Sequence, residues 1–315
     1  MRFDPTHVPR GTKRSLDLRG AVRWQVLVAR GKRAGKTILV LGGVHGDEYE
    51  GPMAIHQLFR SLDPREMRGD FLAVPICNSL AFAAKRRTTP QDGKNLARCF
   101  PGKPRGTVTE RIAHALHHQF IARADFAIDL HSSGSQWTMP TLSGYNSGKP
   151  ALERVQHEAC LRFGAPVVWG SPYAPGRTLS SAYDLDIPSL YTETAGQNGC
   201  QGRDVDLYAN GVRNVMVMLG ILPSRYASRV ARPKLIIKER GGYGNLDTAV
   251  KANHDGLFVA RRNVLDRVNK GELIGELFRP DGKLLQTFRA NRGGRLFLIR
   301  HASPTRQGDL VFQIT

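Results

Sequence analysis

The chain has 315 residues, 41% of them hydrophobic, and a formal net charge of +19 at pH 7. This apolar fraction supports a folded core and excludes a wholly disordered chain. The N-terminal segment lacks the apolar stretch of a secretory signal, and no apolar run is long enough to cross a bilayer. The four cysteines show no CxxC spacing, so we expect reduced thiols in a cytoplasmic protein with no membrane partner.

The positive charge is concentrated toward the C-terminus. From Arg225 onward the chain holds 18 Lys and Arg against 8 Asp and Glu. Such a surface attracts nucleic acid, acidic lipid or a carboxylate substrate. Because no basic stretch is interleaved with stacking aromatic residues, we do not expect nucleic acid to be the partner.

In the first two thirds of the chain, strand patterns alternate with helix patterns. Period and composition predict strands at 23–29, 37–44, 71–76, 125–131, 165–170 and 188–194, with the turn "RGKRAG" joining the first two. Helical spacing predicts helices at 49–62, 107–124 and 203–220, the second with a Thr-x-x-Glu start. A long loop separates 71–76 from 107–124, and loops of this length are usually functional. The alternation predicts an α/β fold, a mixed sheet flanked by helices.

Beyond residue 225 the pattern changes to short β-segments separated by turns such as "VNKG" and "PDGK". A weak internal repeat relates the segments from Gly256 and Gly294, which suggests two similar halves. We therefore predict a catalytic domain at 1–224 and a small β-sandwich or barrel domain at 225–315.

Three metal-binding side chains follow predicted strands. His45 and Glu48 come after strand 37–44, in "GGVHGDEYEG", and His131 ends strand 125–131. The carboxyl ends of strands in such sheets are where ligands bind, and a catalytic zinc takes three protein ligands. Asp129 lies two residues before His131 on the same side of its strand and is a candidate to orient an imidazole.

A carboxylate and a basic loop complete the candidate site. Glu193 ends the apolar strand 188–194, where it is either a general base beside an activated water or a salt-bridged core carboxylate. Arg87 and Arg98 flank "TTPQDGKNLA". Arginine polarises carbonyl oxygens and binds carboxylates, although a single loop arginine is more often simply solvated.

These ordered motifs together resemble the succinylglutamate desuccinylase/aspartoacylase family, zinc deacylases related to zinc carboxypeptidases. "GGVHGDEYEG", "NSLAFAAKRRTTPQDGKNLARCFPG", "IDLHSSG" and "IPSLYTETAG" carry the resemblance. It implies that His45, Glu48 and His131 bind one Zn²⁺, that Glu193 and Arg87 are catalytic, and that Arg98 holds a substrate carboxylate. The C-terminal region is similar to the appended barrel-like domain of the family.

The sequence departs from the family pattern in the loop that carries Arg87 and Arg98, called the arginine loop below. The family's Asp-Leu-Asn-Arg is replaced by Asn95-Leu96-Ala97-Arg98, which removes a hydrogen-bond donor beside Arg98. The resemblance assigns Asn95 and Arg177 as further substrate-binding residues. The zinc chemistry is expected to survive the change. Whether the protein is specific for an amino-acid α-carboxylate is left open.

The resulting hypothesis is a zinc-dependent amidohydrolase that removes the acyl group from a small anionic N-acyl amino acid or related amine. One alternative is a metallocarboxypeptidase acting on peptides, and another is a non-catalytic basic protein that binds acidic partners. Two nitrogens and one carboxylate also suit manganese or cobalt. The oligomeric state stays open, with a homodimer as one expectation.

Overall fold

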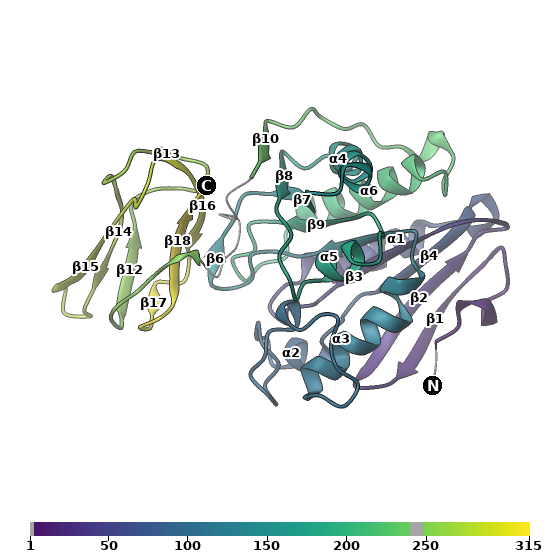
Figure 1. Cartoon of the computed structure of the whole chain (residues 1–315), viewed down its shortest axis with the longest axis horizontal. Helices are drawn as coiled ribbons and strands as arrows, with labels where there is room; N and C mark the ends of the chain where they lie inside the picture. Colours follow the sequence, from purple (N-terminus) through teal and green to yellow (C-terminus); the bar gives the residue numbers. More distant parts are fainter. Residues whose placement is uncertain (1–2, 240–247) are drawn as a thin grey trace.

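The computed structural model describes residues 3–239 and 248–315. Figure 1 shows a large sheet with helices on both faces, built from the first three quarters of the chain. A smaller, all-β part formed by the C-terminal residues lies to one side of it.

The large sheet has nine strands in the order β1-β2-β4-β3-β5-β9-β7-β8-β10. Its central strands β3, β5 and β9 are parallel neighbours, whereas β1, β2 and β7 contribute antiparallel pairs. The strands are β1 (Thr12–Arg19), β2 (Arg23–Arg30), β3 (Arg33–Gly42), β4 (Arg68–Val74), β5 (Phe126–Leu130), β7 (Leu142–Asn146), β8 (Val167–Ser171), β9 (Ser189–Glu193) and β10 (Leu235–Lys238).

Two helical layers bury the two faces of this sheet. Alternate residues of β3 point to opposite sides, so Ile38 and Val40 belong to one core and Leu39 and Leu41 to the other. Helices α1, α4 and α6 cover the first face and α3 covers the second. The helices are α1 (Glu50–Ser61), α2 (Ser79–Ala83), α3 (Val108–Gln119), α4 (Pro150–Phe163), α5 (Thr178–Tyr183) and α6 (Gly202–Met218). In the part of the chain that the structure describes, no helix is long and apolar enough to span a bilayer.

The predicted mixed sheet with flanking helices is confirmed, as are the six predicted strands and three predicted helices. The Thr-x-x-Glu start of α3 is also confirmed, since the Thr107 N–H donates to Glu110 Oε2 at 2.8 Å. The two largest differences lie at the start of β3 and at the end of α3. Strand β3 begins at Arg33, inside the predicted turn, and α3 ends at Gln119 and is followed by a 3-10 turn at Ile121–Arg123.

The C-terminal part is a pair of antiparallel sheets packed around their own core. One has the order β11-β18-β16-β13, with β6 also paired to β16, and the other has the order β15-β14-β12-β17. The strands are β6 (Trp137–Thr138), β11 (Val250–Lys251), β12 (Gly256–Ala260), β13 (Arg267–Val268), β14 (Leu273–Phe278), β15 (Leu284–Arg289), β16 (Gly294–Arg300), β17 (Pro304–Thr305) and β18 (Leu310–Ile314).

The internal repeat corresponds to two interlocked halves. In the first half β12 pairs with β14, and in the second β16 pairs with β18. One short strand of each half also pairs with the other half: β13 pairs with β16, and β17 pairs with β12. This exchange interlocks the two halves into the two antiparallel sheets.

The boundary between the two parts stays a prediction. Strand β10 lies beyond residue 225 but pairs with β8 in the large sheet, in parallel register from Leu235 to Lys238. We therefore propose that the catalytic unit extends through Lys238 and that the β unit starts after it.

Gly46 allows the loop between β3 and α1 to lie directly against α2. A Cβ atom at this position would stand 2.0 Å from the carbonyl carbon and oxygen of Ala81. The Gly46 N–H also donates to the Arg86 carbonyl at 2.9 Å. The loop that carries His45 and Glu48 therefore depends on a glycine at its centre.

We expect Gly46→Ala to lower the free energy of unfolding by about 1–3 kcal/mol, because the added methyl group overpacks the loop against backbone that cannot move aside. Urea unfolding of the variant measures this change. Gly202→Ala is the matched control, since nothing lies within 4 Å of a Cβ at Gly202. Equal losses in the two variants would contradict the argument.

Candidate metal centre and active site

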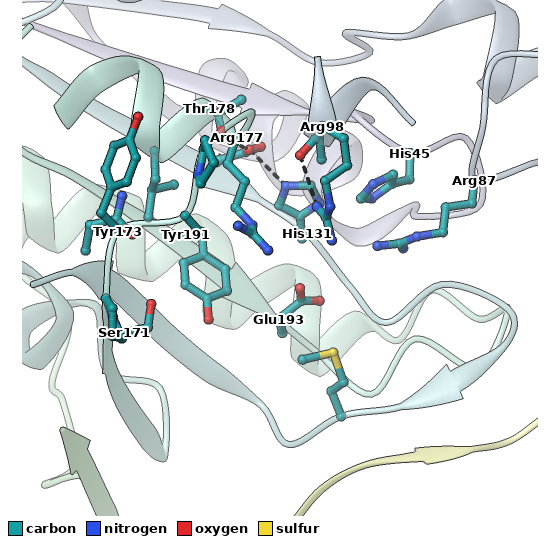
Figure 2. Close-up of a pocket in the computed structure, with 18 residues that line it drawn as sticks. His45, Arg87, Arg98, His131, Ser171, Tyr173, Arg177, Thr178, Tyr191 and Glu193 are labelled. Carbon is teal, nitrogen blue, oxygen red and sulfur yellow. Dashed lines mark hydrogen bonds and ion pairs between the residues drawn. The ribbon is translucent and has the colours of Figure 1, made fainter. Parts of the chain in front are cut away.

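The adjacent parallel strands β3, β5 and β9 deliver the candidate residues to one edge of the sheet. His45 lies three residues beyond the end of β3, His131 directly follows β5, and Glu193 is the last residue of β9. Because parallel neighbours end at the same edge, residues far apart in sequence meet there. Figure 2 shows His45, His131, Glu193 and Arg87 directed toward one cavity.

The Glu48 carboxylate lies between the two imidazoles. Its Oε1 is 2.7 Å from His45 Nδ1, and its Oε2 is 2.9 Å from His131 Nδ1. One ligand atom from each of the three residues falls within 4.8 Å of the others. All three side chains are buried, with His45 and Glu48 each 2% exposed. The donor set of two nitrogens and one carboxylate oxygen fits a catalytic divalent metal.

The Nε2 atom of each imidazole, which points away from Glu48, makes a hydrogen bond to a different residue. His131 Nε2 donates to Asp129 Oδ2 at 2.9 Å, and Thr178 donates a hydroxyl hydrogen bond to the same oxygen. Asp129 therefore holds the His131 ring with Nδ1 toward Glu48, as the strand pattern predicts.

His45 Nε2 lies 3.0 Å from Asn95 Oδ1. The backbone N–H of Ala97 donates to that same oxygen at 2.9 Å, which identifies it as the amide oxygen and His45 Nε2–H as a donor. Nδ1 is then the nitrogen left for a metal. The predicted role of Asn95 in substrate binding stays a prediction, while its side-chain oxygen faces His45.

The charges of the site shift the pKa values of its members in opposite directions. Burial raises the pKa of Glu48, but the nearby His45 and His131 outweigh burial and hold it well below its usual range. Burial lowers the pKa of His131, but Asp129 and Glu48 outweigh it and raise this pKa well above the usual value. Burial, assisted by Arg87, lowers the pKa of His45.

Glu193 lines the cavity beside the candidate ligands. Its Oε2 is buried and makes no hydrogen bond within residues 3–239 and 248–315. Burial, together with the negative charge of Glu48, raises the pKa of Glu193 to about 8. A carboxyl group with a pKa near neutrality can both accept and return a proton.

Three arginines converge on the same cavity. Arg87 Nη1 donates to Glu48 Oε1 at 3.2 Å, and its guanidinium carbon lies 5.3 Å from the centre of the Trp137 ring. Arg98 Nη1 donates to the Ala97 carbonyl at 3.0 Å. Both Arg98 and Arg177 line the cavity. Figure 2 shows the side chains of Arg98 and Arg177 directed into the same cavity as Glu193.

The remainder of the cavity wall is largely apolar and aromatic. The cavity holds about 240 Å³, enough for a small metabolite. Ala97, the sequence neighbour of Arg98, also lines the cavity. The further wall residues are Met139, Asn146, Ser171, Pro172, Tyr173, Ala174, Pro175, Leu179 and Tyr191.

Comparison with known proteins assigns the fold and site to a family. Residues 34–219 match the succinylglutamate desuccinylase/aspartoacylase catalytic domain. The chain belongs to this family. It is accordingly an amidohydrolase of the deacylase type, and His45, Glu48 and His131 form its metal site.

Individual family members are similar over nearly the whole chain. The N-alpha-acetyl-L-2,4-diaminobutyric acid deacetylase of Halomonas elongata is 29% identical over 93% of this chain and 85% of its own length. A succinylglutamate desuccinylase from Silicibacter sp. TM1040 superposes with a TM-score of 0.84 at 28% identity, covering 98% of this chain and 96% of that one. The product-bound ectoine utilization protein EutE of Ruegeria pomeroyi gives a TM-score of 0.83 at 29% identity, covering 93% and 89%.

Sequence reasoning missed three supporting residues of this family site. Thr178 bonds Asp129, Trp137 lies against Arg87, and Tyr208 donates its hydroxyl hydrogen to the His131 carbonyl. Thr178 adjoins the candidate Arg177, but nothing in the sequence near Trp137 or Tyr208 signals these contacts.

The raised pKa of Glu193 predicts a pH-dependent stability in the metal-free protein. The unfolded chain loses this proton near the ordinary Glu value of 4.5, whereas the folded protein keeps it up to about pH 8. The folded state therefore binds more protons in that window, and the free energy of unfolding falls as pH rises through it.

Glu193→Gln removes this titration. Between about pH 5 and pH 9, the free energy of unfolding should therefore fall less in the variant than in wild type. We expect the difference to be ~1–3 kcal/mol, a value that allows for partial solvation of the carboxylate. Urea unfolding of both proteins in excess chelator measures the difference. Parallel pH profiles for the two proteins would contradict the assignment.

Proposed function

We propose that the protein is a zinc-dependent deacylase that hydrolyses the amide bond of a small, anionic N-acyl amino acid. The observation that carries the proposal is the convergence of the His45, Glu48 and His131 ligand atoms with Glu193 and three arginines around one cavity. Zinc is the metal best suited to two imidazole nitrogens, one carboxylate and an open position.

A zinc ion held by His45, Glu48 and His131 would supply the Lewis acidity that activates a water and polarises the scissile carbonyl. Glu193 takes a proton from that water and returns it to the departing nitrogen. Its buried Oε2, which has no hydrogen-bond partner among the described residues, supports this double role, as does its pKa, which burial and Glu48 raise to about 8.

Arg87 is the residue that we expect to stabilise the negative charge that develops on the carbonyl oxygen. It donates to the metal ligand Glu48, so its guanidinium stands at the edge of the metal site. Arg98 and Arg177 lie further along the cavity, where they suit the carboxylate of the substrate. Because Ala97 offers no side-chain donor beside Arg98, the carboxylate is held mainly by the arginines.

The charge of the cavity favours a neutral or anionic substrate side chain. The Halomonas elongata relative is named for an acetylated diaminobutyric acid, which carries an amino group on its side chain. Among the residues lining the cavity here, the acids are Asp129 and Glu193, and Asp129 is already bonded to His131 and Thr178. We therefore expect this chain to act on acyl amino acids without a cationic side chain.

Two further expectations belong to this proposal. Cys77, Cys99, Cys160 and Cys200 are free thiols, which suits a reducing cytoplasm. A metallocarboxypeptidase remains the second candidate, because the same metal chemistry cleaves peptide bonds. Family membership favours the deacylase over this reading and over a non-catalytic basic protein.

A substrate panel tests the proposal. Zinc-loaded protein is expected to hydrolyse N-acetyl and N-succinyl amino acids, and to lose activity when the α-carboxylate is blocked as an amide. Glu193→Ala should keep its zinc but lose about 10²–10⁴-fold in turnover, because the proton acceptor is gone. Glu158→Ala is the matched control and should behave as wild type, because it replaces a half-exposed glutamate that is paired with Arg162.

Three outcomes would contradict parts of this account. Faster hydrolysis of blocked peptides than of N-acyl amino acids would favour the carboxypeptidase. No hydrolysis by the zinc-loaded protein would reject the deacylase. Full activity in Glu193→Ala would remove Glu193 from the mechanism.

A further inference from the structure

The C-terminal β unit is joined to the metal site by the short strand β6. This strand begins six residues after the ligand His131 and pairs with β16 of the C-terminal sheet, with Thr138 opposite Ile299 and Trp137 opposite Arg300. Figure 1 shows β6 between the two parts of the molecule, beside β16 and β18. The loop that leaves the metal site is therefore fixed at its far end by the other unit.

The side chain of Trp137 is fixed by the C-terminal unit as well. Its indole N–H donates to the carbonyl of Leu310, the first residue of β18, at 2.9 Å. The side chain is buried in an apolar cluster that includes Phe297 and Leu298 of β16. Backbone pairing, a hydrogen bond and packing thus determine where the plane of the ring lies.

Arg87 lies against the face of this ring. Its guanidinium carbon is 5.3 Å from the ring centre, within the range of a cation–π contact, while Nη1 is 3.2 Å from Glu48 Oε1. Arg87 lies outside the helices and strands of the structure. The ring and the Glu48 carboxylate therefore contact the guanidinium from two directions.

We propose that Trp137 is a positioning residue through which the C-terminal β unit holds Arg87 at the metal site. The inference rests on the role of Arg87 in the proposed function. A guanidinium fixed in advance stabilises a developing oxyanion without reorganising during the reaction, whereas a mobile one must be ordered first. The C-terminal unit then contributes to turnover although it supplies none of the candidate catalytic residues.

A double-mutant cycle between Trp137 and Arg87 tests the proposal. Trp137→Leu removes the aromatic face and is expected to lower kcat about tenfold, with KM and zinc content changed less than about twofold, because the contact acts in the transition state. Trp137→Phe keeps an aromatic face and should lower kcat less than Trp137→Leu does. In an Arg87→Ala background, Trp137→Leu should cause no further loss beyond about twofold.

Trp169→Leu is the matched control. Trp169 is a buried tryptophan of the same apolar cluster, with its ring 4.2 Å from that of Phe297. Arg87 is in cation–π range of Trp137, not of Trp169, among the contacts of the described residues. The effect of Trp169→Leu on turnover should be the same in the wild-type and Arg87→Ala backgrounds.

The outcomes separate this proposal from the proposed function. Equal fold losses from Trp137→Leu in both backgrounds would assign Trp137 a purely structural role and overturn the positioning proposal, leaving the deacylase intact. Full activity in Arg87→Ala would overturn both the positioning proposal and the role of Arg87. A crystal structure of Trp137→Leu is a readout independent of turnover, and Arg87 still bonded to Glu48 there would also overturn the positioning proposal.

Discussion

The structure of the site depends on one buried carboxylate. Glu48 is 2% exposed, and an unpaired charge at such a position would be strongly destabilising. Its two oxygens face His45 Nδ1 and His131 Nδ1, and Arg87 and the Ser132 N–H donate to it as well. These partners compensate its burial and at the same time assemble three metal ligands at one point.

Three of these partners, His45, His131 and Arg87, are in turn held by different parts of the fold. Asp129 on β5 orients His131, Asn95 in the arginine loop orients His45, and Trp137 contacts Arg87. The supports come from the sheet, from a long loop and from a strand paired to the C-terminal unit. Residues from distant parts of the chain therefore support the three metal ligands.

The sequence predicts those parts of the site that depend on strand ends. His45, His131 and Glu193 follow apolar strands, and parallel neighbours bring such residues together, so the order of strands and helices is enough to infer their convergence. The basic loop indicated Arg87 and Arg98, and the family motifs assigned roles to both and added Arg177. Strand β7 was missed because "LSGYN" is short and polar. Helix α4 was missed because its histidine and glutamine interrupt the apolar spacing.

The contacts that orient the site could not be predicted in the same way. Asn95 is 50 residues from His45, and the loop that carries Asn95 has no periodic pattern that places its amide beside an imidazole. The contact between Trp137 and Arg87 requires the C-terminal sheet to fix the ring, through a hydrogen bond to Leu310, which is 173 residues away. Such contacts follow from tertiary packing, and the local sequence does not encode them.

Metal content tests the central claim most directly. We would measure zinc in purified wild type, in His131→Ala, and in His118→Ala, which replaces an exposed histidine of α3. About one zinc per chain is expected in wild type and in His118→Ala, and almost none in His131→Ala. Wild type that takes up no metal when zinc is supplied, or His131→Ala that retains it, would contradict a site built around Glu48.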